Sequence, residues 1–466
     1  MIPLLGSFGT VLIIYGLFRF NRGAFKVTNA IWAPYVWLLI ASSRPLSNWL
    51  SLSEPVGAST AYVDGSPLDR NVLTLLLVVG IVTLYRRQKQ ALAILSKDWL
   101  ILAYFAYCLA SVLWCDYPEV LLKRWIRSIG DIVMILIIIT EPHWMDALKW
   151  LFTRISFILM PASILLIRFY PSLGRFYSRG GVPEWTGVGT DKNALGMICM
   201  IYGAALLWYG LSVYRGRPAT RQRKRELWTI GIVFAMILYL LFVVNSQTAL
   251  ACFLLSNVLI ILTTYSRMFR KPGIVTLMMV AMVGVCYCVL FLGVGGGALS
   301  AIGRDSSLTG RTEVWKTVIP YAKNVWLGAG YENFWVGERM ELFERLLGGL
   351  NQAHNGYIEI YLNLGWVGLS LLAAIILGGY LKVLKLVRNN IETGGLRLAF
   401  IFICLVYNFT EASFKMQSPV WIFFLWAIMG ASYAAKTSNP RKKPFAAVQA
   451  DLLGTGLRPT LSAQSL

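Results

Sequence analysis

Histidine, acidic side chains and paired cysteines are scarce in this chain of 466 residues, and each scarcity narrows the possible chemistry. Only two histidines occur, His143 and His354, beside 22 acidic and 43 basic residues. The seven cysteines all lie within or at the ends of apolar runs, and none forms a Cys-x-x-Cys pair. Because neither a zinc knuckle nor a disulfide framework is encoded, we expect no metal and no other cofactor.

What the chain has in abundance is apolar sequence. Hydrophobic residues make up 57% of it and charged residues only 14%, whereas about a quarter of a soluble domain is charged. Apolar runs long enough to cross a bilayer, roughly 17–25 residues, recur throughout. We predict 13 of them, the first three short, at 3–19, 29–43, 71–85, 98–115, 128–140, 148–168, 193–214, 227–244, 249–264, 274–295, 365–386, 398–413 and 419–435.

The predicted fold class is all-α: a polytopic membrane helix bundle of about 12–13 transmembrane helices with one large periplasmic loop that contains short helices. Four regions follow from the spacing of the apolar runs. They are an N-terminal transmembrane bundle at 1–295, a periplasmic catalytic loop at 296–364, C-terminal transmembrane helices at 365–435, and a disordered basic cytoplasmic tail at 436–466.

The basic residues set the predicted orientation. The segments 19–28, 86–97, 141–154, 215–226, 266–272, 382–397 and the tail from 436 carry 27 of the 43 lysines and arginines. Short loops rich in Lys and Arg face the cytoplasm. We therefore expect the large loop on the outside; the family resemblance described below implies that the membrane is the bacterial inner membrane and that this side is the periplasm. The net charge of +21 does not indicate nucleic acid, because these charges separate membrane spans.

The large loop contains two predicted helices. The first begins near Thr309 or Thr312, either of which could cap it. The second is an amphipathic stretch at 334–347 that either lies along the membrane face or packs against the bundle. Trp315, Tyr331 and Trp335 are candidates for stacking on sugar rings, although core packing is the simpler explanation for these aromatic residues.

The end of this loop holds the histidine that suits proton transfer. His354 borders the predicted periplasmic loop, and the imidazole pKa suits general acid–base chemistry near neutrality. A helix over this segment puts Asn355 and Glu359 on one face. A purely structural role for His354 is the alternative.

Arginines gather on the same side, at Arg175, Arg179, Arg304 and Arg311. A guanidinium binds phosphate oxygens with two parallel hydrogen bonds and remains charged at every relevant pH. Two or three of these arginines could hold a diphosphate without a metal. The alternative is headgroup anchoring, or ion pairs with neighbours such as Glu313.

Several motifs together resemble the O-antigen ligase/polymerase family, which includes exopolysaccharide polymerases. In the outer loop these are Gly310-Arg311-Thr312-Glu313-x-Trp315, Gly328-x-Gly330, and His354-Asn355 followed by Gly365 and Gly368. Upstream they are Ser43-Arg44-Pro45-Leu46-Ser47-x-Trp49 and Thr186-Gly187-Val188-x-x-x-Lys192-Asn193-x-Leu195-Gly196. The resemblance spans roughly residues 29–430.

The resemblance implies a metal-independent, inverting glycosyltransferase that works on the periplasmic side. Its donor would be an oligosaccharide on a polyprenyl diphosphate, and its acceptor a glycan or the lipid A-core of lipopolysaccharide. By motif position, Arg311 and His354 match the residues that hold the diphosphate and assist the acceptor hydroxyl. Arg175 and Arg179 both fall in the loop that supplies a further arginine. The expected supporting residues are Asn355, Glu359, Lys192, Asn193 and Trp315.

Two alternatives stay open. The sequence does not separate ligation from polymerisation, because the acceptor decides between them. A transporter or flippase of a lipid-linked anionic saccharide is the alternative from another functional class. It would use the same arginines as a relay and need no base, although transporters usually carry internal repeats and ionisable residues near the membrane midplane.

Overall fold

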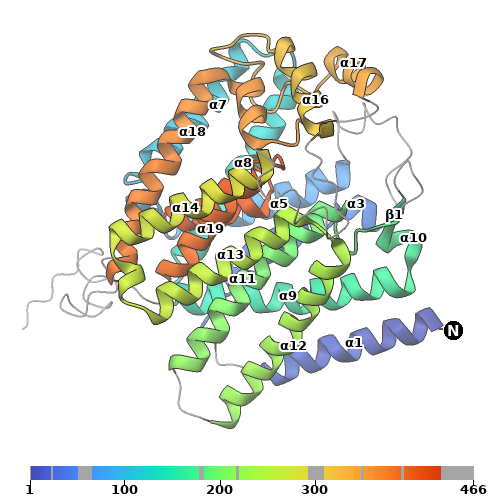
Figure 1. Cartoon of the computed structure of the whole chain (residues 1–466), viewed down its shortest axis with the longest axis vertical. Coiled ribbons are helices and arrows are strands. Elements are labelled where there is room, and N and C mark those ends of the chain that lie inside the picture. The colour runs from blue at the N-terminus through green and yellow to red at the C-terminus, as the bar shows by residue number, and fades with distance from the viewer. Residues whose placement is uncertain are drawn as a thin grey trace, which may run out of the picture.

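The computed structural model describes residues 2–21, 25–50, 66–177, 183–216, 220–291, 309–347, 351–389 and 393–431. Nearly all of this is helical (Figure 1), as predicted. The first half contains α1 (Ile2–Phe20), α2 (Trp32–Ala41), α3 (Leu46–Trp49), α5 (Pro67–Tyr85), α6 (Gln88–Leu95), α7 (Trp99–Ala110), α8 (Pro118–Ile139), α9 (Trp144–Phe169), α10 (Pro171–Gly174) and α11 (Lys192–Gly216). The strands β1 (Arg175–Tyr177) and β2 (Pro183–Trp185) form an antiparallel pair between α10 and α11.

The second half holds the long helices that lead into and out of the outer loop. These are α12 (Arg221–Val244), α13 (Gln247–Tyr265), α14 (Pro272–Phe291), α16 (Thr309–Val318), α17 (Glu338–Leu347), α18 (Gly356–Asn389), α19 (Gly394–Tyr407) and α20 (Pro419–Ile428). Short 3-10 turns lie at Asn29–Ile31, Ser111–Leu113, Met268–Arg270 and Ile319–Tyr321. The two helices predicted in the outer loop are α16 and α17, while the predicted tail lies outside the described residues.

The prediction of a polytopic helical membrane protein is confirmed, but the number of full crossings differs from the expected 12–13. Within the described ranges, eight helices are long and apolar enough to cross a membrane, or up to nine if the bent pair α6–α7 is one span. Each of the other predicted spans coincides with a helix that fails this test. Three of these, Asn29–Ala41, Gly394–Tyr407 and Pro419–Ile428, are apolar but short. Helix α8 is long enough but carries Lys123, Arg124, Arg127 and Asp131.

The short apolar helices are stable because the rest of the bundle surrounds them. Every residue of α20 is buried, and α20 packs against α19, α8, α11 and α18. Its last carbonyls are capped by Arg397 of α19, whose Nη1 donates to the oxygens of Trp426, Ala427 and Met429 at 3.0, 2.6 and 3.1 Å. A helix end inside a protein needs such partners for its free carbonyls. By contrast, α1 and α5 expose most of their apolar surface, as lipid-facing helices do.

The predicted grouping of loops on one face agrees with the contacts. The Glu141 carboxylate, in the segment 141–154, accepts from Thr28 at 2.5 Å and from Arg87 at 3.1 Å. On the same face, the Lys382 ammonium donates to the carbonyl of Lys97 at 2.8 Å. Four segments that were expected to lie together therefore touch one another.

A break in α18 joins the outer loop to the bundle. Gly365 has φ 62° and ψ −164°, so the helix is interrupted there. Backbone groups freed by a break must find other partners, and residues 325–330 of the outer loop supply them. Four backbone hydrogen bonds cross the break: Ala329 N to Leu362 O (3.1 Å), Gly330 N to Asn363 O (2.8 Å), Trp366 N to Val325 O (2.9 Å) and Val367 N to Trp326 O (3.1 Å).

The outer loop also has a small core of its own. Val314, Val318, Phe334, Trp335 and Phe343 are buried together, with the rings of Phe334 and Phe343 5.7 Å apart. The amphipathic stretch therefore uses its apolar face for packing within the outer loop and against the start of α18, where Leu362 belongs to the same core.

We expect Gly365→Ala to destabilise the protein strongly. A Cβ at residue 365 would lie 2.3 Å from the backbone of Trp326, and the positive φ is itself unfavourable for alanine. The thermal unfolding midpoint of the detergent-solubilised protein should fall by several degrees or more. The control is Gly284→Ala in α14, where a Cβ meets nothing within 4 Å. Equal midpoints for the two variants would contradict the described backbone at Gly365.

Candidate functional site

A single buried carboxylate, Glu411, lies at the centre of the candidate site. It follows α19 in the turn that leads to α20, and it is 8% exposed. Its Oε1 accepts from Arg311 Nη2 at 2.7 Å and from Asn193 Nδ2 at 2.9 Å. Its Oε2 lies 3.3 Å from Nδ1 of His354. Three predicted site residues from three parts of the chain therefore meet at an acidic residue that was not predicted.

The start of α18 fixes the position of His354. Asn355 Oδ1 accepts from the backbone N–H groups of Tyr357 and Ile358, at 3.0 and 3.1 Å, which caps the helix. Its Nδ2 donates to the carbonyl of Phe409 at 3.0 Å, so the same amide ties α18 to the end of α19. Asn355 caps the helix, and its carbonyl accepts from the backbone N–H of Glu359 at 3.0 Å, so the two residues are one helical turn apart.

The backbone of His354 is held in an unusual conformation. Its φ is 49°, in the left-handed region that non-glycine residues rarely adopt. On the N-terminal side, Trp315 Nε1 donates to the carbonyl of Ala353 at 2.7 Å. Trp315 and Asn355 thus hold the chain on either side of His354. Residues kept in such conformations cluster at functional sites.

The hydrogen-bonding capacity of Glu411 sets the tautomer of His354. An ionised carboxylate only accepts hydrogen bonds, so the proton between the two groups belongs to Nδ1. Nε2 then carries the lone pair and can accept a proton. Gln352 approaches the same Nδ1 at a longer 3.5 Å, and its Oε1 accepts from Lys415 at 3.3 Å.

A cavity with an empty volume of about 670 Å³ opens beside Glu411. Its polar wall includes Ser43, Asp191, Asn193, Gln352 and Lys415. The cavity lies between α11, the turn after α2, and the turn between α19 and α20.

Arg44 brings the two upstream motifs to this cavity. Its guanidinium donates to the carbonyls of Gly189 and Gly187, at 2.8 and 3.0 Å, and to the hydroxyl of Thr186 at 3.0 Å. Its backbone N–H donates to the carbonyl of Val188 at 3.1 Å. The Ser43–Trp49 tract and the Thr186–Gly196 tract therefore form one unit at the edge of the site.

Other predicted residues have partners other than Glu411. Lys192 pairs with Glu184 at 2.7 Å. Arg175 in β1 donates to the carbonyl of Ile167 at 3.0 Å and stacks 4.4 Å from the ring of Trp185. Arg179 lies outside the described residues, as does Arg304. The Glu359 carboxylate accepts from Trp335 Nε1, at 3.0 and 2.9 Å, rather than from His354.

The aromatic residues considered for sugar stacking are mostly packed. Tyr331 and Trp335 are each 3% exposed, and Trp315 is partly buried with its N–H already engaged. Core packing, the second alternative, therefore describes all three.

Glu411, Lys415 and Gln352 were missed from the sequence. A signal for two of them exists, because Glu411 and Lys415 interrupt a long apolar stretch between Arg397 and the tail. An ionisable residue between apolar spans is a functional candidate by default. The span predicted at 398–413 includes Glu411, so the prediction assigns this residue to a transmembrane helix.

Comparisons with known proteins agree with the motifs. The family described as O-antigen ligase matches residues 231–373, a range that includes Arg311 and His354. Asn193 and Glu411 lie outside it. The "Exopolysaccharide production protein ExoQ" of Rhizobium meliloti (strain 1021) is 24% identical over 299 residues, which are 61% of this chain. The match covers 65% of that relative, slightly less than two thirds of its length.

Proposed function

We propose, from the O-antigen ligase/polymerase family that both comparisons support for this chain, that it transfers or polymerises a glycan carried on a polyprenyl diphosphate. The observation that carries this proposal is the meeting of Arg311 and His354 at Glu411 beside a cavity. A fixed cation for a leaving diphosphate and an imidazole for a hydroxyl proton are the two groups that such a transfer needs.

The proposed reaction is a direct displacement. The oxygen of an acceptor hydroxyl attacks the anomeric carbon of the donor sugar from the face opposite the diphosphate. The new carbon–oxygen bond forms as the bond from carbon to the diphosphate oxygen breaks, so the configuration inverts. The electron pair leaves with the polyprenyl diphosphate, and the hydroxyl proton passes to Nε2 of His354.

The role proposed for Arg311 is to meet the charge that develops on the leaving diphosphate. Its side chain is 26% exposed, so solvent screens it only in part. Because Arg311 already pairs with Glu411, diphosphate binding would exchange one anion for another. Arg175 or Arg179 would supply a second cation, and Arg175 would have to leave its place over Trp185 to do so.

Glu411 is proposed as a positioning residue. It holds Nδ1–H of His354 and so presents Nε2 to the acceptor, as the carboxylate of a hydrolase triad does for its histidine. Metal-independent chemistry is part of the proposal. Arginine side chains rather than a metal ion would meet the charge of the leaving diphosphate.

The first test concerns sidedness, since the proposal needs the site in the periplasm. Glu344→Cys on α17 and Lys224→Cys on α12 both introduce exposed thiols, at opposite ends of the predicted topology. With the outer membrane permeabilised, a membrane-impermeant maleimide should label Cys at 344 and leave Cys at 224 unlabelled until the inner membrane is broken. The unsubstituted chain gives the background of the native cysteines. The reverse pattern would refute the orientation.

The second test concerns the two groups that touch substrate. Purified protein with a lipid-linked donor and an acceptor, assayed in EDTA, should turn over. His354→Ala should lower kcat on the order of 10²–10⁴-fold with donor affinity unchanged. Arg311→Lys keeps the charge but loses the paired donors, and should lower kcat/KM about 10²-fold.

His143→Ala and Arg345→Lys, both at exposed positions, are the matched controls. Normal turnover by His354→Ala would make that histidine structural. A parent protein that moves lipid-linked saccharide across vesicles without joining glycans would favour the transporter alternative. Activity lost in EDTA and restored by Mg²⁺ would refute the metal-independent mechanism.

The third test separates positioning from folding at Glu411. Glu411→Gln should lower kcat on the order of 10²-fold, because the amide no longer fixes the tautomer of His354. The donor KM should fall or stay constant, since Arg311 loses its internal anion. Glu313→Gln, an exposed carboxylate on α16 beside Arg311, should change neither constant. A raised donor KM with normal kcat would show that Glu411 instead binds the donor.

A further inference from the structure

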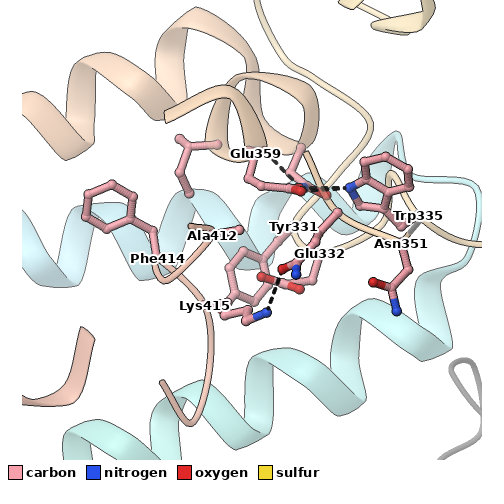
Figure 2. A pocket seen from close by; sticks show the side chains of 11 residues that line it. Tyr331, Glu332, Trp335, Asn351, Glu359, Ala412, Phe414 and Lys415 are labelled. Atoms are coloured by element: carbon pink, nitrogen blue, oxygen red, sulfur yellow. Dashed lines mark hydrogen bonds between the residues drawn. The ribbon is translucent and has the colours of Figure 1, made fainter. Parts of the chain in front are cut away.

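A second pocket lies on the other side of Gln352 and Lys415, and the proposed function leaves it without a role. It has an empty volume of about 600 Å³. Figure 2 shows Glu332, Glu359 and Lys415 directed into one space bounded by Trp335 and Phe414. The pocket shares Gln352, Ala412 and Lys415 with the cavity beside Glu411.

The shared wall connects the pocket to the reaction site. Gln352 lies 3.5 Å from Nδ1 of His354 through its Nε2, and its Oε1 accepts from Lys415 at 3.3 Å. One side chain therefore separates the second pocket from the imidazole. Gln352 therefore lies between the second pocket and the Nδ1 edge of the imidazole.

The polar groups of the pocket suit hydroxyls better than anions. Two carboxylates, Glu332 and Glu359, face one ammonium group, and the amides of Asn351 and Gln352 add donors and acceptors. No arginine is among the described residues that line this pocket, whereas Arg311 lies beside Glu411. Sugar hydroxyls both donate and accept, so they can satisfy carboxylates, amides and an ammonium together.

Among the lining residues, Glu332 has the surroundings best suited to bind sugar hydroxyls. Its backbone has φ 52°, and its carbonyl accepts from Arg124. Burial raises the pKa of its carboxyl, while Arg124 and Lys415 act in the opposite direction. A carboxylate withdrawn from water gains most from hydrogen-bond donors that a ligand brings.

Glu359 differs from Glu332, because other groups of the protein already donate hydrogen bonds to its carboxylate. Its oxygens accept from Trp335 Nε1 and from the backbone N–H of Ala353. Its carboxylate fixes the Trp335 ring as a wall of the pocket and holds the chain next to His354. Selection of a ligand by this pocket therefore depends on Glu332, Asn351 and Lys415.

We propose that this pocket binds an uncharged sugar unit of the acceptor, next to the residues that hold His354 in place. The proposal rests on the glycan transfer proposed above. It divides the site into a donor side, with Arg311, and an acceptor side, with Glu332.

Two probes test it: the neutral oligosaccharide repeat released from the polymer of cells that carry this protein, and the same oligosaccharide oxidised at C6 to uronic acids. Binding to the purified full chain in nanodiscs is measured by calorimetry without donor. The neutral probe should bind at least about 10-fold more tightly than the oxidised one, because the carboxylates repel the added charge.

Glu332→Gln should weaken the neutral probe about 10-fold and narrow the difference between the probes. In turnover assays it should raise the acceptor KM by a similar factor, with kcat and donor KM near the parent values. Glu344→Gln, an exposed carboxylate on α17, is the matched control. Parent-like binding of both probes by a folded Glu332→Gln variant would overturn the proposal, and so would tighter binding of the oxidised probe.

If Glu332→Gln does not fold, Asn351→Ala replaces it, because Asn351 is exposed and lines the same pocket. It should raise the acceptor KM several-fold, and an unchanged acceptor KM would refute the proposal. A parent protein that binds the neutral probe through Glu332 but never transfers sugar would remove the proposed function and leave the pocket assignment standing.

Discussion

The break in α18 at Gly365 is the constraint on which the candidate site depends. It lets residues 325–330 pair with 362–367, and that pairing attaches the outer loop to the bundle. Glu332 lies two residues after the first paired segment, 325–330. Glu359 lies three residues before the second, 362–367. A straight α18 would have no free backbone groups to offer. The glycines of the motif, Gly328 and Gly365, are explained by close backbone approach rather than by contact with a substrate.

The second organising interaction is electrostatic. Glu411 collects Arg311 from α16, Asn193 from α11 and His354 from the turn before α18. A buried carboxylate is costly unless its oxygens are satisfied, and here each oxygen has a partner that the proposed reaction also needs. The same contacts that make Glu411 tolerable in the bundle therefore bring the reactive groups together.

The sequence was informative about helices and motifs and uninformative about long-range partners. Apolar runs located a helix at every predicted span, yet run length could not distinguish a full crossing from an enclosed short helix such as α20. Motif order identified Arg311, His354 and Asn193. It could not reveal that Arg311 meets a carboxylate 100 residues later, because that contact depends on how distant segments of the chain pack together. Lys192 and Arg175 were expected nearby, but short-range partners, Glu184 and Trp185, hold them elsewhere.

The ion pair between Arg311 and Glu411 also gives the empty site a tethered competitor. A carboxylate fixed 2.7 Å from the guanidinium acts at a very high effective concentration. A small free anion such as inorganic phosphate offers Arg311 little more than the carboxylate already does, so it gains little by displacing it. Under the proposed function, a ligand whose sugar and lipid also contact the cavity wall gains further binding free energy, which offsets the loss of the ion pair between Arg311 and Glu411. Under the proposed function, the ion pair would therefore favour a lipid-linked diphosphate over small free anions.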